Sequence, residues 1–160
     1  MSFRVGLGYD VHQLVVGETL WLGGILIPHD KGLVAHSDGD VLLHAICDAL
    51  LGAAKLRDIG FHFPDTSSEY KNIDSKLLLA ETYHLVTNKG YRLINLDATI
   101  SAQRPRLKDY IPQMESAIAG VLQVDLEAIN IKATTTEKLG FEGREEGISV
   151  QAVVLIEKVG

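Results

Sequence analysis

The chain contains a single cysteine, Cys47, among its 160 residues. One thiol cannot form a disulfide within the chain, so the sequence excludes a secreted disulfide scaffold and a zinc cluster built from cysteines. Apolar runs are also short, and none reaches the roughly 18 residues that suggest a membrane span. Gly6, Gly8 and Asp10 interrupt the first dozen residues, which lack the sections of a signal peptide. We therefore expect a cytoplasmic protein that spans no membrane.

Basic residues are scarce as well. Fifteen Lys and Arg stand against 21 Asp and Glu, which gives a formal net charge of −6. Because no run of five basic residues occurs, we expect neither a nucleic acid nor an anionic membrane as partner. A small anionic ligand remains compatible with this charge. The length and the 46% apolar content suit a single domain, residues 1–160, with one hydrophobic core.

Two hydrophobic periods alternate along the chain and predict an α/β (α+β) domain. Alternation of apolar and other residues, or short apolar runs, predicts strands over residues 3–9, 20–22, 25–27, 91–100, 128–133 and 148–156. Spacings of three and four residues predict helices over residues 42–53, 74–88 and 111–121. Ser37 or Asp38 is placed to cap the first helix. Polar loops are expected over 28–37, 55–73 and 101–109, and long loops in a small domain are usually functional.

Asp10 and His12 are two metal-ligand types on one expected strand. Residues two apart on a strand project to the same side, so both can reach one ion. His44, on the polar edge of the first expected helix, is the third candidate, and an Asp/His/His set with an open position is typical of catalytic zinc. The alternative is a surface Asp-x-His pair beside an unrelated half-buried histidine. Asp48 is either a partner that orients His44 or an exposed helix carboxylate.

Three further segments are candidates for phosphate binding. His36 precedes the first helix, where free backbone N–H groups attract anions. It is either a hydrogen-bond donor to a phosphate or an ordinary loop residue. Residues 134–138 (TTTEK) can hold phosphate oxygens and magnesium, although strand threonines and a helix cap at Thr136 explain them equally well. Residues 103–108 contain three basic side chains. These either contact a nucleotide phosphate or belong to an ordinary solvated loop. Gly6-Leu7-Gly8 is not a dinucleotide fingerprint, because no helix follows at once.

These motifs occur in a characteristic order. They are the Asp-Val-His of residues 10–12, AHSDGD of 35–40 followed by His44, DIG of 58–60, FPDT of 63–66, QRP of 103–105, TTTEKLGF of 134–141 and GR of 143–144. In this order, over essentially the whole chain, the sequence resembles the 2-C-methyl-D-erythritol 2,4-cyclodiphosphate synthase family. Because the chain has 160 residues, we expect it to lack the cytidylyltransferase domain that is fused to some relatives.

The resemblance implies a fold, an assembly and a reaction. The fold is a compact single domain with a mixed sheet covered by helices on one face, assembled as a homotrimer with active sites between subunits. The reaction is the closure of 4-diphosphocytidyl-2-C-methyl-D-erythritol 2-phosphate to a cyclic diphosphate with release of CMP, in the non-mevalonate isoprenoid pathway. Its expected cofactors are zinc, or another divalent transition metal, and magnesium or manganese. A zinc-dependent phosphohydrolase and an inactive trimer that binds metal or isoprenoid are the competing hypotheses.

Site residues are carried over from the resemblance position by position. The implied metal ligands are Asp10, His12 and His44 for zinc and Glu137 for magnesium. The implied transition-state stabilisers are His36 and Thr135. The residues implied to contact the diphosphate and the erythritol part of the substrate are Asp10, His12, His36, Ser37, Asp58, Ile59, Gly60, Phe63, Pro64, Asp65, Thr66 and Ser67. Those implied around the cytidine and its phosphates are Ala102, Gln103, Arg104, Pro105, Arg106, Leu107, Lys108, Thr134, Thr135, Thr136 and Glu137.

Phe141 and Arg144 match further substrate-site positions, and Arg144 with Glu146 also matches a pair that lines the central cavity of the trimer. The sequence departs from the family pattern at three positions, Phe61, Glu142 and Glu145. None of these is a metal-ligand position. The departures bear on finer properties, such as the ligand of the central cavity.

Overall fold

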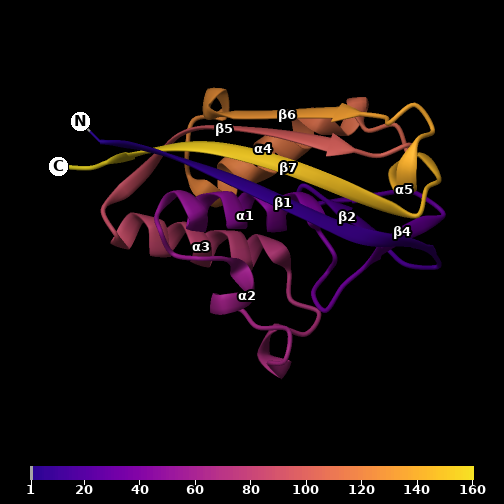
Figure 1. The fold of residues 1–160 in the computed structure, drawn as a ribbon, viewed down its shortest axis with the longest axis horizontal. Helices are drawn as coiled ribbons and strands as arrows, with labels where there is room; N and C mark the ends of the chain where they lie inside the picture. Colours follow the sequence, from indigo (N-terminus) through magenta and orange to yellow (C-terminus); the bar gives the residue numbers. More distant parts are fainter. Residues whose placement is uncertain (1) are drawn as a thin grey trace.

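A five-stranded mixed sheet organises the chain in the computed structural model, which describes residues 2–160 (Figure 1). The strands are β1 (Phe3–Val16), β2 (Leu20–Leu22), β3 (Ile25–Ile27), β4 (Lys31–Val34), β5 (Tyr91–Ser101), β6 (Ile129–Thr134) and β7 (Gly147–Lys158). Their order in the sheet is β4-β1-β7-β5-β6, and only the β5–β6 pair is parallel. Strands β2 and β3, both predicted as strands, pair with each other in a two-stranded antiparallel hairpin outside this sheet.

The helices are α1 (Val41–Ala53), α2 (Ile59–His62), α3 (Ser75–Asn88), α4 (Ile111–Leu122) and α5 (Gly140–Gly143). Helix α1 packs against β1 and β7, with α3 below it, and α4 packs against β6 and α3 (Figure 1). The predicted α/β class, with a mixed sheet and helices packed on one face, is confirmed. Within residues 2–160, no helix is long and apolar enough to cross a membrane.

The structure corrects several boundaries. Strand β4 lies within residues 28–37 and helix α2 within 55–73, both predicted to be loops, and β1 continues to Val16. Neither short element has enough residues to display a hydrophobic period. In β5, Leu93 is buried instead of Ile94, because a bulge between Leu93 and Asn95 shifts the alternation by one residue.

The first strand is buried on the side opposite to its large apolar residues. Gly6 and Gly8 face α1, and a Cβ built on them would lie 1.9 Å from the Ala49 carbonyl oxygen and 1.8 Å from that of Ala45. The glycines therefore let α1 lie directly on the strand, which accounts for the Gly-x-Gly pattern without any nucleotide. Asp10 continues the glycine side and so also faces α1.

Replacing Gly8 by alanine is expected to destabilise the protein by about 3 kcal/mol, because the new methyl group must displace the backbone of α1 at Ala45. Chemical denaturation followed by circular dichroism measures this difference. Gly120→Ala is the control, since a Cβ at Gly120 meets nothing within 4 Å. Equal stability of the two variants would contradict the close approach of β1 and α1.

Helix α1 is capped by Asp40, and not by Ser37 or Asp38 as predicted. The Asp40 carboxylate is fully buried and accepts from Leu43 N at 3.1 Å, Gly23 N at 3.0 Å and Gly24 N at 2.7 Å. Burial raises the pKa of Asp40, whereas the three backbone donors act against that rise. Asp40 thus joins the hairpin turn to the start of α1 and holds the His44 turn of the helix in place.

Candidate active site

Asp10, His12 and His44 meet between β1 and the first turns of α1. Asp10 Oδ2 lies 2.9 Å from His12 Nε2 and 3.4 Å from His44 Nδ1, and the two ring nitrogens are 3.4 Å apart. The two rings meet edge to face at 5.0 Å between centroids. The structure therefore brings together the three side chains predicted as one metal site. His44 is buried, not on a polar helix edge, because α1 is enclosed by the sheet and α3.

The donor set fits a zinc ion. Tetrahedral zinc with bonds of about 2.0–2.1 Å places its ligand atoms about 3.3 Å apart, close to the separations of the three donor atoms. One carboxylate and two imidazoles are ligands that suit zinc and related transition metals. Three protein ligands also leave one tetrahedral position for a substrate oxygen. The triad can thus hold a metal that contacts a ligand in the adjoining cavity.

Within the triad, hydrogen bonds between Asp10 and the histidines stabilise the charged forms of Asp10 and His12. Burial raises the pKa of Asp10, but hydrogen bonds with His12 and His44 outweigh burial and hold it well below its usual value. Burial lowers the pKa of His12, but the hydrogen bond and the negative charge of Asp10, together with the hydrogen bond to the Gly39 carbonyl oxygen, outweigh burial and leave the pKa raised. The site therefore contains an anionic carboxylate beneath the surface, which favours a bound cation.

The outer nitrogens of both imidazoles are also held. His12 Nδ1 lies 2.8 Å from the Gly39 carbonyl oxygen, which can only accept, so Nδ1 donates and Nε2 is the nitrogen that would bind a metal. His44 Nε2 faces Ser75 Oγ at 2.9 Å and Ser37 Oγ at 3.1 Å. Metal-binding histidines commonly have such partners, which fix the orientation of the ring. Asp48 is not one of them, since it accepts instead from Ile59 N at 2.9 Å.

A cavity of about 330 Å³ opens beside the triad. Its walls come from β4 and the following loop, α2, the segment after α2, and the start of α3. The predicted site residues on its lining are Asp10, His12, His36, Ser37, His44, Ile59, Gly60, Phe63 and Asp65. The predicted Asp58, Pro64, Thr66 and Ser67 are not on it. Asp58 caps α2 by accepting from Phe61 N at 3.0 Å, and the Ser67 carbonyl oxygen lies 3.0 Å from His36 Nε2.

The second group of predicted residues lies elsewhere on the molecule. A cavity of about 340 Å³ is lined by Ala102, Gln103, Pro105, Arg106, Leu107, Lys108, Thr134 and Thr135, among others. Arg104 and His29 join part of this set around a neighbouring hollow of about 510 Å³. The two loops are tied by a hydrogen bond from Lys138 N to Gln103 Oε1 of 3.1 Å. Glu137 is exposed, with its N–H 3.3 Å from Thr135 Oγ1.

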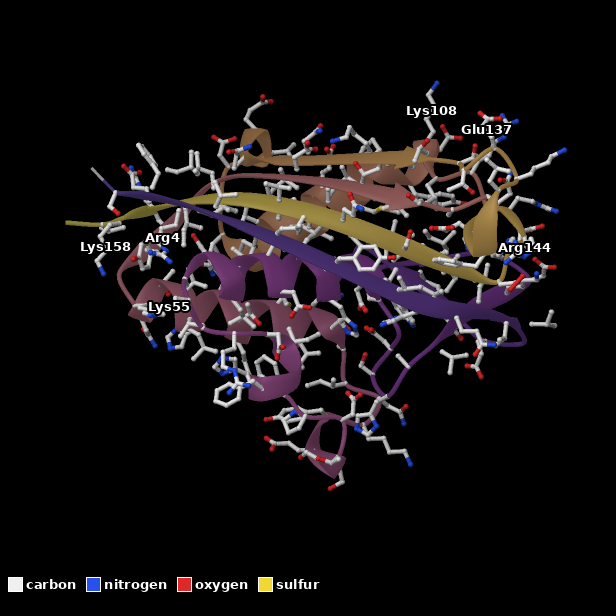
Figure 2. The ribbon with its side chains drawn as sticks, in the orientation of Figure 1. Arg4, Lys55, Lys108, Glu137, Arg144 and Lys158 are labelled. Atoms are coloured by element: carbon white, nitrogen blue, oxygen red, sulfur yellow. The ribbon has the colours of Figure 1, made fainter. Side chains whose placement is uncertain are left out.

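Within one chain the two groups stay apart. Among residues 2–160, none lines both the triad cavity and either hollow of the second group. Strands β7 and β5 separate β1 from β6, which puts β1 and β6 about 14 Å apart across the sheet. Figure 2 shows Lys108, Glu137 and Arg144 at the end of the molecule opposite Arg4, Lys55 and Lys158.

The remaining predicted positions have mainly local contacts. Arg144 forms an ion pair with Glu146, and the Phe141 ring lies against Gly147. Thr136, predicted as a possible helix cap, donates to the Leu139 carbonyl oxygen at 2.6 Å. None of the four predicted positions, Thr136, Phe141, Arg144 and Glu146, lines the cavities described above.

The three departures from the family pattern are also accounted for by local contacts. The Arg57 guanidinium lies 4.2 Å above the exposed Phe61 ring. Glu142 Oε1 accepts from Ser149 Oγ at 3.0 Å, and Glu145 Oε1 is 4.0 Å from Arg104 Nε. Of the three residues that depart from the family pattern, Glu145 is therefore the one whose side chain lies near the second group of site residues.

Sequence reasoning missed several residues of the site. Tyr70, Ile73 and Leu78 complete the wall of the triad cavity, and Ser75 contacts His44. Ser75 is 31 positions from His44 and reads locally as an ordinary residue at a helix start. No local pattern relates the two, so only the packing of α3 against α1 reveals the contact.

Known proteins are similar to this chain in both sequence and fold. The family model of the YgbB family matches residues 3–157. The 2-C-methyl-D-erythritol 2,4-cyclodiphosphate synthase of Bacteroides thetaiotaomicron is 66% identical over 158 residues, which cover 99% of each chain. That of Parabacteroides distasonis is 63% identical over 160 residues, 100% of this chain and 99% of the relative.

Solved structures of related proteins have the same fold as this chain. The bifunctional IspDF of Campylobacter jejuni matches with a TM-score of 0.95 and 48% identity, over 98% of this chain and 42% of that one. IspF of Plasmodium falciparum, in a CDP complex, matches with a TM-score of 0.87 and 33% identity, over 99% and 98% of the two chains. Together with the family match and the curated relatives, these structures confirm the resemblance, and the chain belongs to the YgbB family.

Proposed function

We propose that the protein is a 2-C-methyl-D-erythritol 2,4-cyclodiphosphate synthase of isoprenoid precursor synthesis. The observation that carries this proposal is the Asp10, His12 and His44 triad beside a cavity of about 330 Å³, in a chain 66% identical to a synthase of that name. The substrate is 4-diphosphocytidyl-2-C-methyl-D-erythritol 2-phosphate. The products are the 2,4-cyclodiphosphate and CMP.

The reaction forms one phosphorus–oxygen bond and breaks another. An oxygen of the 2-phosphate attacks the β-phosphorus, and the bond from that phosphorus to the oxygen shared with the α-phosphate breaks. CMP leaves with the shared oxygen and its electron pair, so no water is consumed. Catalysis of this kind is mainly positioning of the two phosphates and neutralisation of their charge.

The triad is the proposed zinc site. A zinc ion held by Asp10, His12 and His44 supplies Lewis-acid polarisation of a substrate phosphate oxygen. His36 and Ser37 lie on the same cavity, and we assign both to contacts with the phosphates there. Ile59, Gly60, Phe63 and Asp65 form the part of the cavity wall that we assign to the erythritol moiety.

The loops 102–108 and 134–137 are the proposed site of the cytidine and its phosphates. The CDP complex of the P. falciparum relative supports a nucleotide ligand in this fold. Arg104, Arg106 and Lys108 supply positive charge, and Thr135 supplies a hydroxyl donor for the developing charge. Glu137 is the carboxylate that we assign to magnesium, which prefers one or two carboxylates together with substrate phosphates.

A homotrimer with shared active sites completes this proposal. The sheet face opposite the helices exposes the apolar side chains of Phe3, Val5, Leu7, Tyr9 and Val153. A face of this kind favours burial by further copies of the same chain. Packing around a three-fold axis would place the triad of one subunit beside the nucleotide loops of its neighbour, which explains why one chain separates the two groups.

Product analysis tests the proposed reaction. Purified protein is incubated with substrate, zinc and magnesium in water enriched in oxygen-18, with CMP followed by chromatography and phosphorus products by NMR. We expect equal amounts of CMP and cyclic diphosphate, without label from water. A linear erythritol phosphate that carries oxygen-18 would identify a phosphohydrolase instead, and absence of turnover in metal-loaded protein would favour a binding protein.

Replacing Glu137 by glutamine should raise the magnesium concentration for half-maximal rate by about tenfold, because the neutral amide is a weaker ligand of a hard cation. Magnesium titrations of the cyclisation rate at fixed zinc measure this shift. Glu127→Gln is the matched control, since Glu127 is exposed and lies in the turn that precedes β6. An unchanged titration for the Glu137 variant would contradict the assignment.

A further inference from the structure

The side chain of His44 lies between two sets of partners. Its Nδ1 points toward Asp10 Oδ2 and His12 Nε2, which belong to the triad. Its Nε2 points away from them, toward Ser75 Oγ at 2.9 Å and Ser37 Oγ at 3.1 Å. To bind a metal through Nδ1, the neutral ring must carry its proton on Nε2. The group that accepts from Nε2 therefore decides whether His44 is ready to be a ligand.

Ser75 is held in one hydrogen-bonding state by Asp38. Asp38 Oδ1 lies 2.5 Å from Ser75 Oγ, and Asp38 Oδ2 accepts from Ser75 N at 2.9 Å. Asp38 Oδ1 also accepts from Asp40 N at 3.0 Å, so three donors converge on one carboxylate. An ionised carboxylate only accepts, and the Ser75 hydroxyl therefore donates its single proton to it. Ser75 Oγ then has only lone pairs to offer to His44 Nε2.

Ser37 is not constrained in this way. Its only other contact among the described residues is the N–H of Gly39, at 3.4 Å, and no carboxylate holds its proton. It is half-buried and lies on the lining of the triad cavity. Ser37 is thus free to turn its proton toward a ligand, whereas Ser75 is fully buried and always faces His44 as an acceptor.

We propose that Ser75, held by Asp38, is a positioning residue that fixes His44 as the tautomer protonated on Nε2 and turns Nδ1 toward Asp10 and His12. This inference rests on the proposed function, since the metal would be the one used in the cyclisation. It adds a chain of three side chains, His44, Ser75 and Asp38, behind the ligand set. Partners of this kind commonly change metal affinity by 10–100-fold when they are removed.

The Ser75 hydroxyl is not needed to cap helix α3. Helix α3 is capped by Asp74, whose carboxylate accepts from Lys76 N at 2.9 Å. The backbone N–H of Ser75 joins α3 to Asp38 alongside the hydroxyl, so this link does not depend on the hydroxyl alone. Ser75→Ala keeps the helix cap and this backbone hydrogen bond, and removes the hydroxyl that donates to Asp38 and accepts from His44.

Zinc affinity, measured by competition with a chromophoric chelator, tests the role of Ser75. We expect Ser75→Ala to weaken zinc binding by about 10–100-fold, and Ser75→Thr, which keeps the hydroxyl, to recover most of the affinity. Thr82→Val is the matched control: Thr82 is a fully buried hydroxyl on the same helix and is not among the partners of His44. Wild-type affinity in Ser75→Ala, or an equal loss in Thr82→Val, would overturn the proposal.

The tautomer can be measured without any variant or metal. Long-range proton–nitrogen NMR spectra of the wild-type protein, freed of metal, are expected to show His44 protonated on Nε2. A ring protonated on Nδ1 would overturn the inference even if Ser75→Ala failed to fold. The proposed function fails separately, if the wild-type protein binds no zinc or forms no cyclic product.

Discussion

Replacing His44 by alanine is expected to remove zinc and to lower the rate of cyclisation by about 10³-fold or more. His44 supplies one of only three protein donors, and the remaining Asp10 and His12 lie side by side on one strand. Loss of Lewis-acid stabilisation of a phosphate oxygen is worth several kilocalories per mole, and about 4 kcal/mol corresponds to a thousandfold in rate. Metal analysis of the purified variant and the CMP assay measure the two effects.

Folding of the variant is controlled in the same experiment. Alanine is a good helix former, and α1 is otherwise packed by apolar side chains, so circular dichroism should be close to that of the wild type. His84→Ala, an exposed histidine on α3, should keep both zinc and activity. Turnover at the wild-type rate in the His44 variant would show that the triad is not the metal site of the reaction.

The triad could be predicted from sequence because two independent regularities point to it. Alternation puts Asp10 and His12 on one side of β1, and the helical pattern begins just before His44. The sequence alone does not show that the helix lies on that strand. Gly6 and Gly8, which permit the contact, have no side chains, so the hydrophobic pattern does not record the side of β1 that is buried within the chain.

The elements that line the triad cavity were harder to predict than the core. Strand β4 and helix α2 have only four residues each, too few for a period, and α2 starts at a cap supplied by Asp58. The hydrogen bond from Ile59 N to Asp48 fixes α2 through a side chain of the preceding helix, 11 positions away. Such contacts depend on tertiary structure, and the same holds for Ser75 beside His44.

The large apolar residues of β1 show a second limit of predicting structure from sequence. An alternating strand predicts one buried face, yet Val5 and Leu7 are 67% and 66% exposed in the single chain. Their pattern is understandable if the face is buried by other subunits, as the proposed trimer requires. The hydrophobic pattern thus predicts burial in an assembly and cannot distinguish it from burial within one chain.

Replacing Leu7 by aspartate is therefore expected to convert the protein to monomers and to abolish cyclisation. A buried Leu side chain contributes about 1.5–3 kcal/mol per subunit, and an unpaired carboxylate in its place adds a larger desolvation cost. The three introduced charges would also lie near one another around the axis. Sedimentation equilibrium measures the assembly state, and the CMP assay measures the activity.

A second exposed apolar residue serves as the control that distinguishes loss of assembly from a general effect of the introduced charge. Leu77 is 57% exposed on α3, away from the open face of the sheet, so Leu77→Asp should leave both assembly and activity unchanged. Circular dichroism should show a folded Leu7→Asp chain, because its core within the subunit is formed on the other face of β1. A Leu7→Asp protein that remained trimeric and active would refute the proposed interface.

Shared active sites predict that two inactive variants restore each other. His44→Ala damages the triad and Thr135→Ala the nucleotide loops, which one chain holds apart. If each site takes its triad from one subunit and its loops from the next, random mixed trimers from equal amounts have about one quarter of their sites intact. Co-expression of the two variants should therefore yield about a quarter of the wild-type activity. Activity no higher than that of either variant alone would instead mean that each subunit builds its own complete site.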